Sequence, residues 1–332
     1  MRSKKSVSGW RRKLALVLTA VLVTAGAAAL APATSLGATE AYAATAASQG
    51  QWVSSNGRWW YRNADGSYPK SCWQEIDGKW YHFDSAGWMQ TGWLQDGGNW
   101  YYLDASGASV KYWQAIGGKW YYFDYEWNAG YKMISNTILH DLSSGGLIKL
   151  YYFAPDGSMV TGWYYVGHTG NFDIDGWIYC GTDGAMQFGW QKIDGKWYFL
   201  KGSYGSVINY ASLATGWFQP DFETDWYYSD QNGVMQTGWL AYGGSWYYLL
   251  DSGAMAVGWV NVGGTWYWLT GSGAMATDWQ IINGSWYYLS GSGAMLHDCW
   301  VGNYYLGSSG AMLTNAWTPD GYYVGPDGAW VR

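Results

Sequence analysis

Tryptophan recurs along this chain at a spacing near 20 residues, and this recurrence limits the possible folds more than any other feature. Successive units begin 20, 20, 50, 27, 27, 22, 20, 20, 21 and 17 residues apart. A short period of this kind indicates a repeat array, in which each unit contacts its neighbours. The first tryptophans of the units are Trp73, Trp93, Trp113, Trp163, Trp190, Trp217, Trp239, Trp259, Trp279, Trp300 and Trp317, and Trp52 begins a partial unit before them.

Each regular unit carries a tight-turn signal at one offset from its first tryptophan. The signal is Asp77-Gly78 in one unit, Gly263-Gly264 in another and Asn283-Gly284 in a third. These pairs tolerate positive φ and favour two-residue hairpin turns. The sequence therefore predicts a pair of short antiparallel strands in every regular unit.

A two-residue turn also sets which side chains share a face. With the turn at Gly263-Gly264, Trp259 lies opposite Trp268, and Trp266 shares their face because side chains alternate along a strand. The aromatic cluster is therefore one-sided. The tyrosines expected on the other face, and assigned to packing, include Tyr247 and Tyr267.

The composition suits a stack of such hairpins. The 332 residues include 48 Gly, 28 Trp and 31 Tyr, and no long segment has helical periodicity. One hairpin is marginal in water, but hairpins in series bury their apolar faces on one another. We predict an all-β fold, an elongated β-solenoid of about a dozen stacked β-hairpins.

The 50-residue gap contains a degraded unit. Ile138 lies near the expected first tryptophan, and Leu150-Tyr151-Tyr152 stands where Trp-Tyr-Tyr is expected. We therefore predict a degenerate, inserted region at about residues 124–190.

The first 43 residues differ from the rest. A basic run precedes the apolar stretch Leu14 to Leu30, and Ala41-Tyr42-Ala43 is typical of a cleavage site. This pattern predicts a secretory signal peptide over residues 1–43 and tandem repeats over 44–332. An uncleaved membrane anchor is the alternative, because the apolar stretch approaches spanning length. No later apolar run predicts a membrane span.

The charge limits the classes of ligand that the chain can bind, and the cysteine count bears on disulfide formation. Cleavage would remove six of 18 basic and one of 24 acidic residues, leaving 12 and 23, a balance of −11. Such a chain is not expected to bind nucleic acid, but it suits a cationic ligand. Three cysteines leave at least one unpaired, and small-residue packing is favoured over disulfides.

Aromatic side chains gathered on one face form the walls of a cage. Electron-rich ring faces attract cations at about 0.5–2 kcal/mol per contact, and a quaternary ammonium loses little hydration there. Packing is the competing interpretation, because Trp and Tyr form strands and pack well across them.

The units "TGWLQDGGNWYYLDASGA" and "VGWVNVGGTWYWLTGSGAM" resemble the choline-binding, or cell-wall-binding, repeats of Gram-positive surface proteins. In that family, choline lies between two hairpins, held by two Trp of one and an aromatic of the next, often with a Met. The resemblance implies a secreted, non-catalytic protein held at the cell surface by choline on (lipo)teichoic acid. It also implies a homodimer, of which the residues themselves give no sign.

Carried onto this chain, the pattern predicts these cages. Trp73 and Trp80 would meet Tyr102; Trp93 and Trp100, Tyr122; Trp239 and Trp246, Trp268; Trp259 and Trp266, Tyr288; Trp279 and Trp286, Tyr305. Longer units offer Trp190 with Trp197, and Trp217 with Trp226 and Tyr248. Met255, Met275 and Met295 are candidate cage floors.

Other units depart from this pattern. Trp113 and Trp120 face the degraded unit, so their site is expected to be lost. Trp163 and Trp177 are separated by an insertion, and Trp300 is followed by Asn303 where a second tryptophan is expected.

Two further functions stay open on the sequence alone. Related repeats in glucosyltransferases and clostridial toxins stack on sugars, so a glucan- or glycan-binding protein is one alternative, and a surface adhesin is another. Enzymatic activity is not expected: His168 near Asp173 and Asp175 is interpreted as a solvated loop, and no catalytic, metal or cofactor motif occurs.

Overall fold

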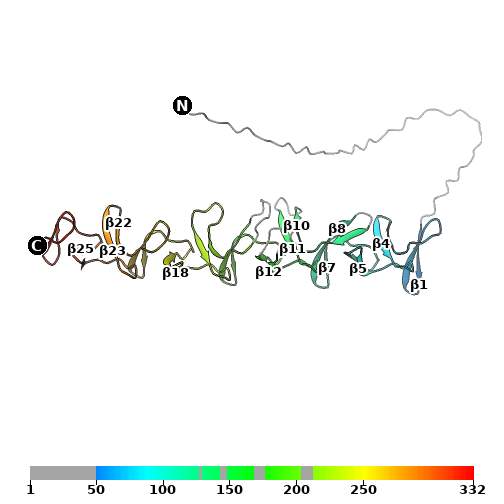
Figure 1. Ribbon diagram of the computed structural model, residues 1–332. Helices are drawn as coiled ribbons and strands as arrows, with labels where there is room; N and C mark the ends of the chain where they lie inside the picture. Colours follow the sequence, from blue (N-terminus) through cyan, green and yellow to red (C-terminus); the bar gives the residue numbers. More distant parts are fainter. Residues whose placement is uncertain (1–49, 127–128, 143–147, 168–175, 203–211) are drawn as a thin grey trace, which may run out of the picture. The chain divides into compact units, whose positions relative to one another are not determined.

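A computed structural model describes residues 50–126, 129–142, 148–167, 176–202 and 212–332 (Figure 1). The expected signal peptide, residues 1–43, and the group of His168, Asp173 and Asp175 lie outside these ranges. The described residues form strands and turns, with no helix among them. None of these described segments is therefore an apolar helix that could cross a membrane.

The described strands pair almost entirely with their neighbours in sequence. Twelve sheets have two strands and one has three. The pairs before the inserted region are β1 (Gln51–Ser55) with β2 (Arg58–Arg62), β3 (Cys72–Ile76) with β4 (Lys79–Phe83), and β5 (Gly92–Asp96) with β6 (Asn99–Leu103). The three-stranded sheet contains β7 (Tyr112–Ile116), β8 (Lys119–Glu126) and β9 (Gly130–Met133).

The remaining strands continue the same series. They pair as β10 (Thr137–Asp141) with β11 (Lys149–Phe153), β12 (Gly162–Val166) with β13 (Gly176–Cys180), β14 (Gly189–Ile193) with β15 (Lys196–Leu200), β16 (Gly216–Phe218) with β17 (Tyr227–Ser229), β18 (Gly238–Tyr242) with β19 (Ser245–Leu249), β20 (Gly258–Val262) with β21 (Thr265–Leu269), β22 (Asp278–Ile282) with β23 (Ser285–Leu289), β24 (Cys299–Val301) with β25 (Tyr304–Leu306), and β26 (Ala316–Trp317) with β27 (Tyr323–Val324).

The turns and registers follow the sequence prediction. Gly263 and Gly264 have φ of 59° and 88°, as a type I′ turn requires. Trp259 pairs with Trp268, and Asn261 pairs with Trp266. The predicted one-sided clustering of the three tryptophans is confirmed.

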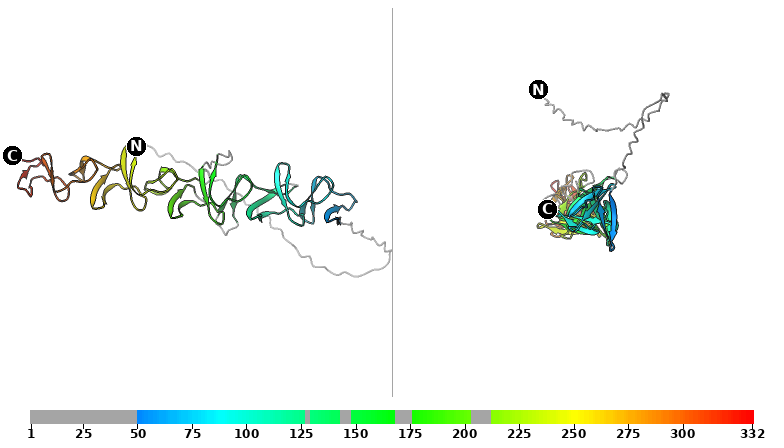
Figure 2. Two further views of the ribbon diagram at one scale, coloured as in Figure 1. Left: turned by 90° about the horizontal axis from the view of Figure 1, so that it is seen from below. Right: turned by 90° about the vertical axis from the view of Figure 1, so that its right-hand side faces the viewer.

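The end of each unit forms a backbone hydrogen bond to the hairpin of the preceding unit. Met275 forms a bridge with Leu269 of its own unit, and its N–H donates to the carbonyl oxygen of Trp246 at 2.7 Å. The same bond joins Met255 to Trp226 and Met295 to Trp266. These bonds couple neighbouring units, so the hairpins stack in sequence order (Figures 1 and 2). The repeat region is the predicted all-β solenoid of hairpins.

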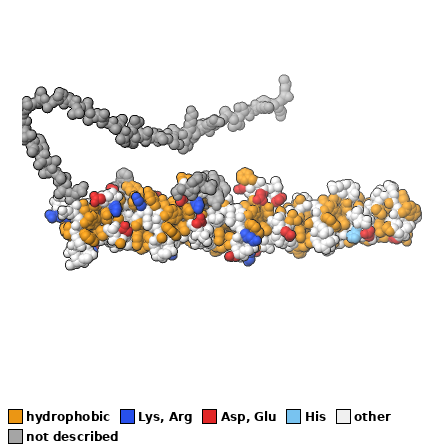
Figure 3. All heavy atoms as spheres, turned by 180° about the vertical axis from the view of Figure 1, so that it is seen from behind, with side chains coloured by type: hydrophobic (Ala, Val, Ile, Leu, Met, Phe, Trp, Pro, Cys, Tyr) orange, Lys and Arg blue, Asp and Glu red, His pale blue; other side chains and the backbone are white. Residues whose placement is uncertain are grey.

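The core of the array is thin and recurs unit by unit. Leu249, Leu269 and Leu289 end the second strands of three successive hairpins and are fully buried. Apolar side chains also cover much of the surface, with charged groups in small clusters between them (Figure 3). The aromatic residues are therefore shared between the interior and the open faces of the hairpins.

Candidate functional site

A cage of three aromatic rings lies between each regular hairpin and the next. Behind β20–β21, the Trp259 and Trp266 rings are 6.5 Å apart and perpendicular. Tyr287 of the following hairpin lies 5.0 Å from Trp259, at 67° to it. Met295, whose N–H bonds to the Trp266 carbonyl, belongs to the same corner. The three rings thus form walls at steep angles around a small space.

This arrangement recurs along the described array. Each set combines the first and second Trp of one hairpin with a Tyr of the next unit. The sets are Trp52, Trp59 and Tyr81; Trp93, Trp100 and Tyr121; Trp113, Trp120 and Tyr151; Trp190, Trp197 and Tyr227; Trp217, Trp226 and Tyr247; Trp239, Trp246 and Tyr267; Trp259, Trp266 and Tyr287; and Trp279, Trp286 and Tyr304.

The second tryptophan of each set is open to solvent. Its exposed fraction lies between 41% for Trp286 and 49% for Trp246 across all eight sets. A large apolar ring left this exposed at a recurring position is a surface available for contact, because a packing residue would be covered.

Two cages are resolved as distinct hollows. One, of about 320 Å³, is lined by Trp279, Trp286, Tyr304, Met312 and Asp327. The other, of about 310 Å³, combines Trp190, Trp197 and Tyr227 with Met235 and Asp251. Both add a thioether and a carboxylate to the three rings, which suits a small organic cation.

The third ring differs from the sequence prediction. Trp268 was expected to face Trp239 and Trp246, but it packs on Trp259 of its own hairpin at 5.2 Å. Tyr267 takes the place instead, 4.8 Å from Trp239. The same correction, by one residue, applies to Tyr102, Tyr122, Tyr248, Tyr288 and Tyr305, which lie against Trp93, Trp113, Trp239, Trp279 and Trp300 of their own hairpins.

The physical reason lies in the stacking. A hairpin presents its aromatic face to the opposite face of the next hairpin, and adjacent residues of a strand point to opposite faces. The contact therefore moves by one residue. Tyr247 and Tyr267, which the sequence assigned to packing, each pack against the first tryptophan of the preceding hairpin and so stand at the place of the third ring.

Each floor methionine belongs to the cage of the preceding hairpin. Met255, Met275 and Met295 bond to Trp226, Trp246 and Trp266 through their N–H groups. A glycine of the following unit packs on each thioether: a Cβ on Gly273 would lie 2.3 Å from the Met255 sulfur. Sequence reasoning missed Met235 and Met312, although both end a unit in the same way as Met255.

The cage of Trp113 and Trp120 is retained, against the sequence prediction. Tyr151 of the degraded unit lies 4.8 Å from Trp113, and the Met159 N–H donates to the Trp120 carbonyl. The degraded unit lost its tryptophans but kept the residues that its predecessor needs. Sequence reasoning also missed Trp59, which follows Trp52 by seven residues as Trp80 follows Trp73.

The degraded unit itself has an aliphatic site in place of a cage. Ile138 pairs with Tyr152 as Trp239 pairs with Tyr248, and Leu150 occupies the position of the second tryptophan. Ile178 replaces the tyrosine, and the Met186 N–H bonds to the Leu150 carbonyl at 2.8 Å. All four side chains are at least 93% buried, so this site is closed core.

The cage of Trp73 and Trp80 is covered by the chain itself. Strand β9 packs against β6, and a Cβ on Gly130 would lie 3.2 Å from the Trp73 ring. Ser109 stands where other units have Met, and its Oγ accepts from the Tyr131 N–H at 3.2 Å. In consequence Trp80 is half-buried, whereas the second tryptophans of the open cages are exposed.

Some of the tyrosine walls have a raised pKa. Burial raises the pKa of Tyr151, and burial with the neighbouring Glu223 raises the pKa of Tyr227 to about 12. Within the described residues, no three His, Cys, Asp or Glu side chains gather as metal ligands. The two hollows at Trp190 and Trp279 combine ring faces with a carboxylate.

Comparisons with known proteins agree with this geometry. Two families are described as "Choline-binding repeat". One matches residues 70–112, 214–258 and 256–300. The other matches residues 294–330. The family "Putative cell wall binding repeat" matches 50–68, 113–125 and 189–203. No curated protein sequence matches the chain.

Solved structures include close counterparts. Choline binding protein F from Streptococcus pneumoniae is 30% identical with a TM-score of 0.54, over 80% of this chain and 98% of that one. CbpJ from Streptococcus pneumoniae is 33% identical with a TM-score of 0.52, over 85% of this chain and 100% of that one. The hairpin array, its recurring cages and these matches show that the chain belongs to the family of choline-binding repeat proteins.

Proposed function

We propose that this protein is a secreted, non-catalytic cell-wall-binding protein that attaches to the bacterial surface by holding the choline of teichoic acids in its aromatic cages. The observation that carries the proposal is the recurring open corner of two tryptophans, a tyrosine and a methionine, with the second tryptophan 41–49% exposed. Residues 1–43 would direct secretion and be removed.

The aliphatic site supports ligand binding over packing as the reason for the aromatics. Ile138, Leu150 and Ile178 hold the same register and the same backbone bond without a single tryptophan. The array therefore needs apolar side chains at these positions, and aliphatic ones serve. Retention of half-exposed indoles elsewhere favours a ligand that uses their faces.

The chemistry suits a quaternary ammonium. Its methyl groups contact the ring faces, its charge is attracted to them, and it requires no hydrogen-bond partner. The predicted balance of −11 after cleavage strengthens the attraction at longer range. Single cages would bind weakly, and a polymer bearing many cholines would engage several at once and bind tightly.

Calorimetric titration of the purified protein with choline chloride, against dextran oligosaccharides, tests the proposal. We expect choline to bind at several sites and to elute the protein from a tertiary-amine resin. Binding of dextran at several sites without choline binding would favour the glycan-binding alternative. Absence of binding by both ligands at millimolar concentration would leave the adhesin.

A further inference from the structure

One pocket of the array differs from the hollows at Trp190 and Trp279. It is lined by Trp163, Trp177 and Tyr198 and has a volume of about 560 Å³. The hollows at Trp190 and Trp279 measure about 310 and 320 Å³. The pocket therefore has room for a larger ligand.

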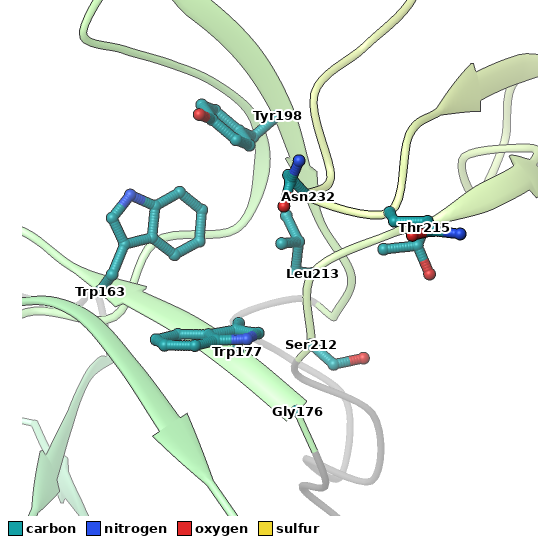
Figure 4. Close-up of a pocket in the computed structure, with 9 residues that line it drawn as sticks. Trp163, Gly176, Trp177, Tyr198, Ser212, Leu213, Thr215 and Asn232 are labelled. Atoms are coloured by element: carbon teal, nitrogen blue, oxygen red, sulfur yellow. The ribbon is translucent and has the colours of Figure 1, made fainter.

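Its aromatic frame is that of the other cages. Tyr198 lies 5.0 Å from Trp163, and Trp177 is 47% exposed. Leu213 takes the place of the floor methionine, and its N–H donates to the Trp177 carbonyl at 2.8 Å. Figure 4 shows the three rings around a common space, with Leu213 and Asn232 across it. The stacking surfaces are thus kept while the floor is changed.

The polar lining changes as well. Gln231 and Asn232 occupy the loop positions that Asp251 and Ser252 hold in the hollow at Trp190. The carboxylate of Asp230 in this loop accepts the N–H groups of Asn232 and Val234 at 2.8 and 2.9 Å. Among its described lining residues the pocket therefore has carboxamides, with donors and acceptors, and no carboxylate.

We propose that this pocket binds a neutral hexopyranose of a glycan, a second ligand class beyond the choline of the proposed function. The apolar face of a sugar ring stacks on an indole, and its hydroxyls require donors and acceptors such as the two amides. A quaternary ammonium makes no hydrogen bonds, and among the described lining residues it would meet no carboxylate like those of the other two hollows. The extra volume accommodates the ring and its substituents.

Calorimetry with the protein saturated in choline isolates this site. Maltotriose, with hydroxyls alone, and chitotriose, with acetamido groups, are titrated separately. We expect at least one to bind with a stoichiometry of one, and Trp177→Ala to weaken it at least tenfold. Gln231→Ala should also weaken the sugar, because it removes an amide donor and acceptor at an exposed loop position.

The controls separate this proposal from the general one. Trp246→Ala should lower the choline stoichiometry by one and leave the sugar isotherm unchanged. Binding of neither oligosaccharide in saturating choline overturns the sugar site, and so does a loss of one choline site in Trp177→Ala. Failure of choline to bind anywhere, in contrast, would overturn the proposed function and leave the sugar titration to be judged by itself.

Discussion

The aliphatic site of the degraded unit and the cage behind β20–β21 occupy equivalent places in the same fold. Ile138 and Leu150 are 7% and 1% exposed, whereas Trp266 at the position of Leu150 is 44% exposed. In both places the N–H of a methionine one unit later bonds to the second strand at 2.8 Å. The backbone hydrogen bond between hairpins is thus independent of the side chains that line the space between them.

The comparison separates two uses of one position. Aliphatic residues fill the space between the two hairpins and form a cluster with Val166, Cys180 and Met186. Aromatic residues are too large and too flat to close it, so they stand as walls around a space. A fold that tolerates both versions can vary the number of binding sites without changing its architecture.

The largest expected effect is a loss of local stability at the aliphatic site of the degraded unit. Leu150→Ala would remove a fully buried side chain and leave a cavity, at a cost of about 2–5 kcal/mol in local stability. Native-state hydrogen exchange of β10–β13 would measure it. The number of choline sites should stay the same, and a loss of choline sites would show that the aliphatic unit also takes part in binding.

The matched change on the aromatic side should affect binding more than folding. Trp266→Ala removes a half-exposed ring, at a cost of about 1–2 kcal/mol in local stability, and abolishes one choline site. Trp266→Phe keeps a ring face and should retain weaker binding. Greater destabilisation by Trp266→Ala than by Leu150→Ala, measured by the same exchange experiment, would make the aromatics packing residues.

The covered cage offers a gain of function. Replacing residues 124–132 with the shorter connection Asp-Ala-Ser-Gly-Ala of residues 104–108 would remove β9 from Trp73. We expect the choline stoichiometry to rise by one in calorimetry. An unchanged stoichiometry with a folded array would mean that Ser109, in place of methionine, already prevents binding, and Ser109→Met in the shortened chain would then restore it.

The smallest effect concerns the thiols. Burial in the aliphatic cluster raises the pKa of Cys180 to about 12. Its contribution to stability is therefore complete below pH 9 and is lost as pH rises toward 12. Iodoacetamide at pH 8.5, followed by mass spectrometry, should label half-buried Cys72 and spare Cys180. Rapid native labelling of Cys180 would show that the aliphatic site opens.

Most of the fold could be predicted because its signals are local. The turn at Gly263-Gly264 sets the register of Trp259 with Trp268, and the period sets the order of hairpins. The two tryptophans of most cages were found in this way, since both belong to one hairpin, but Trp59 was missed. The degraded unit was also located from Ile138 and the pair Tyr151-Tyr152.

Contacts between hairpins were harder to predict. Choosing Tyr267 over Trp268 as the third ring required knowledge of which face the next hairpin presents, and the shared-face argument applies only within a hairpin. The cover over Trp73 and the amide lining at Trp163 come from residues one or two units downstream. No periodicity in the sequence reports such a contact.

By itself the sequence determined the hairpins, their register and the pair of tryptophans in each, because turn chemistry and strand alternation act over fewer than ten residues. Only the tertiary structure decided which ring completes each cage, which cage is covered by β9, and that the aliphatic residues of the degraded unit close their site completely. Those outcomes depend on how one hairpin is rotated onto the next. That rotation is set by packing and backbone bonds between units, which the repeat pattern does not encode.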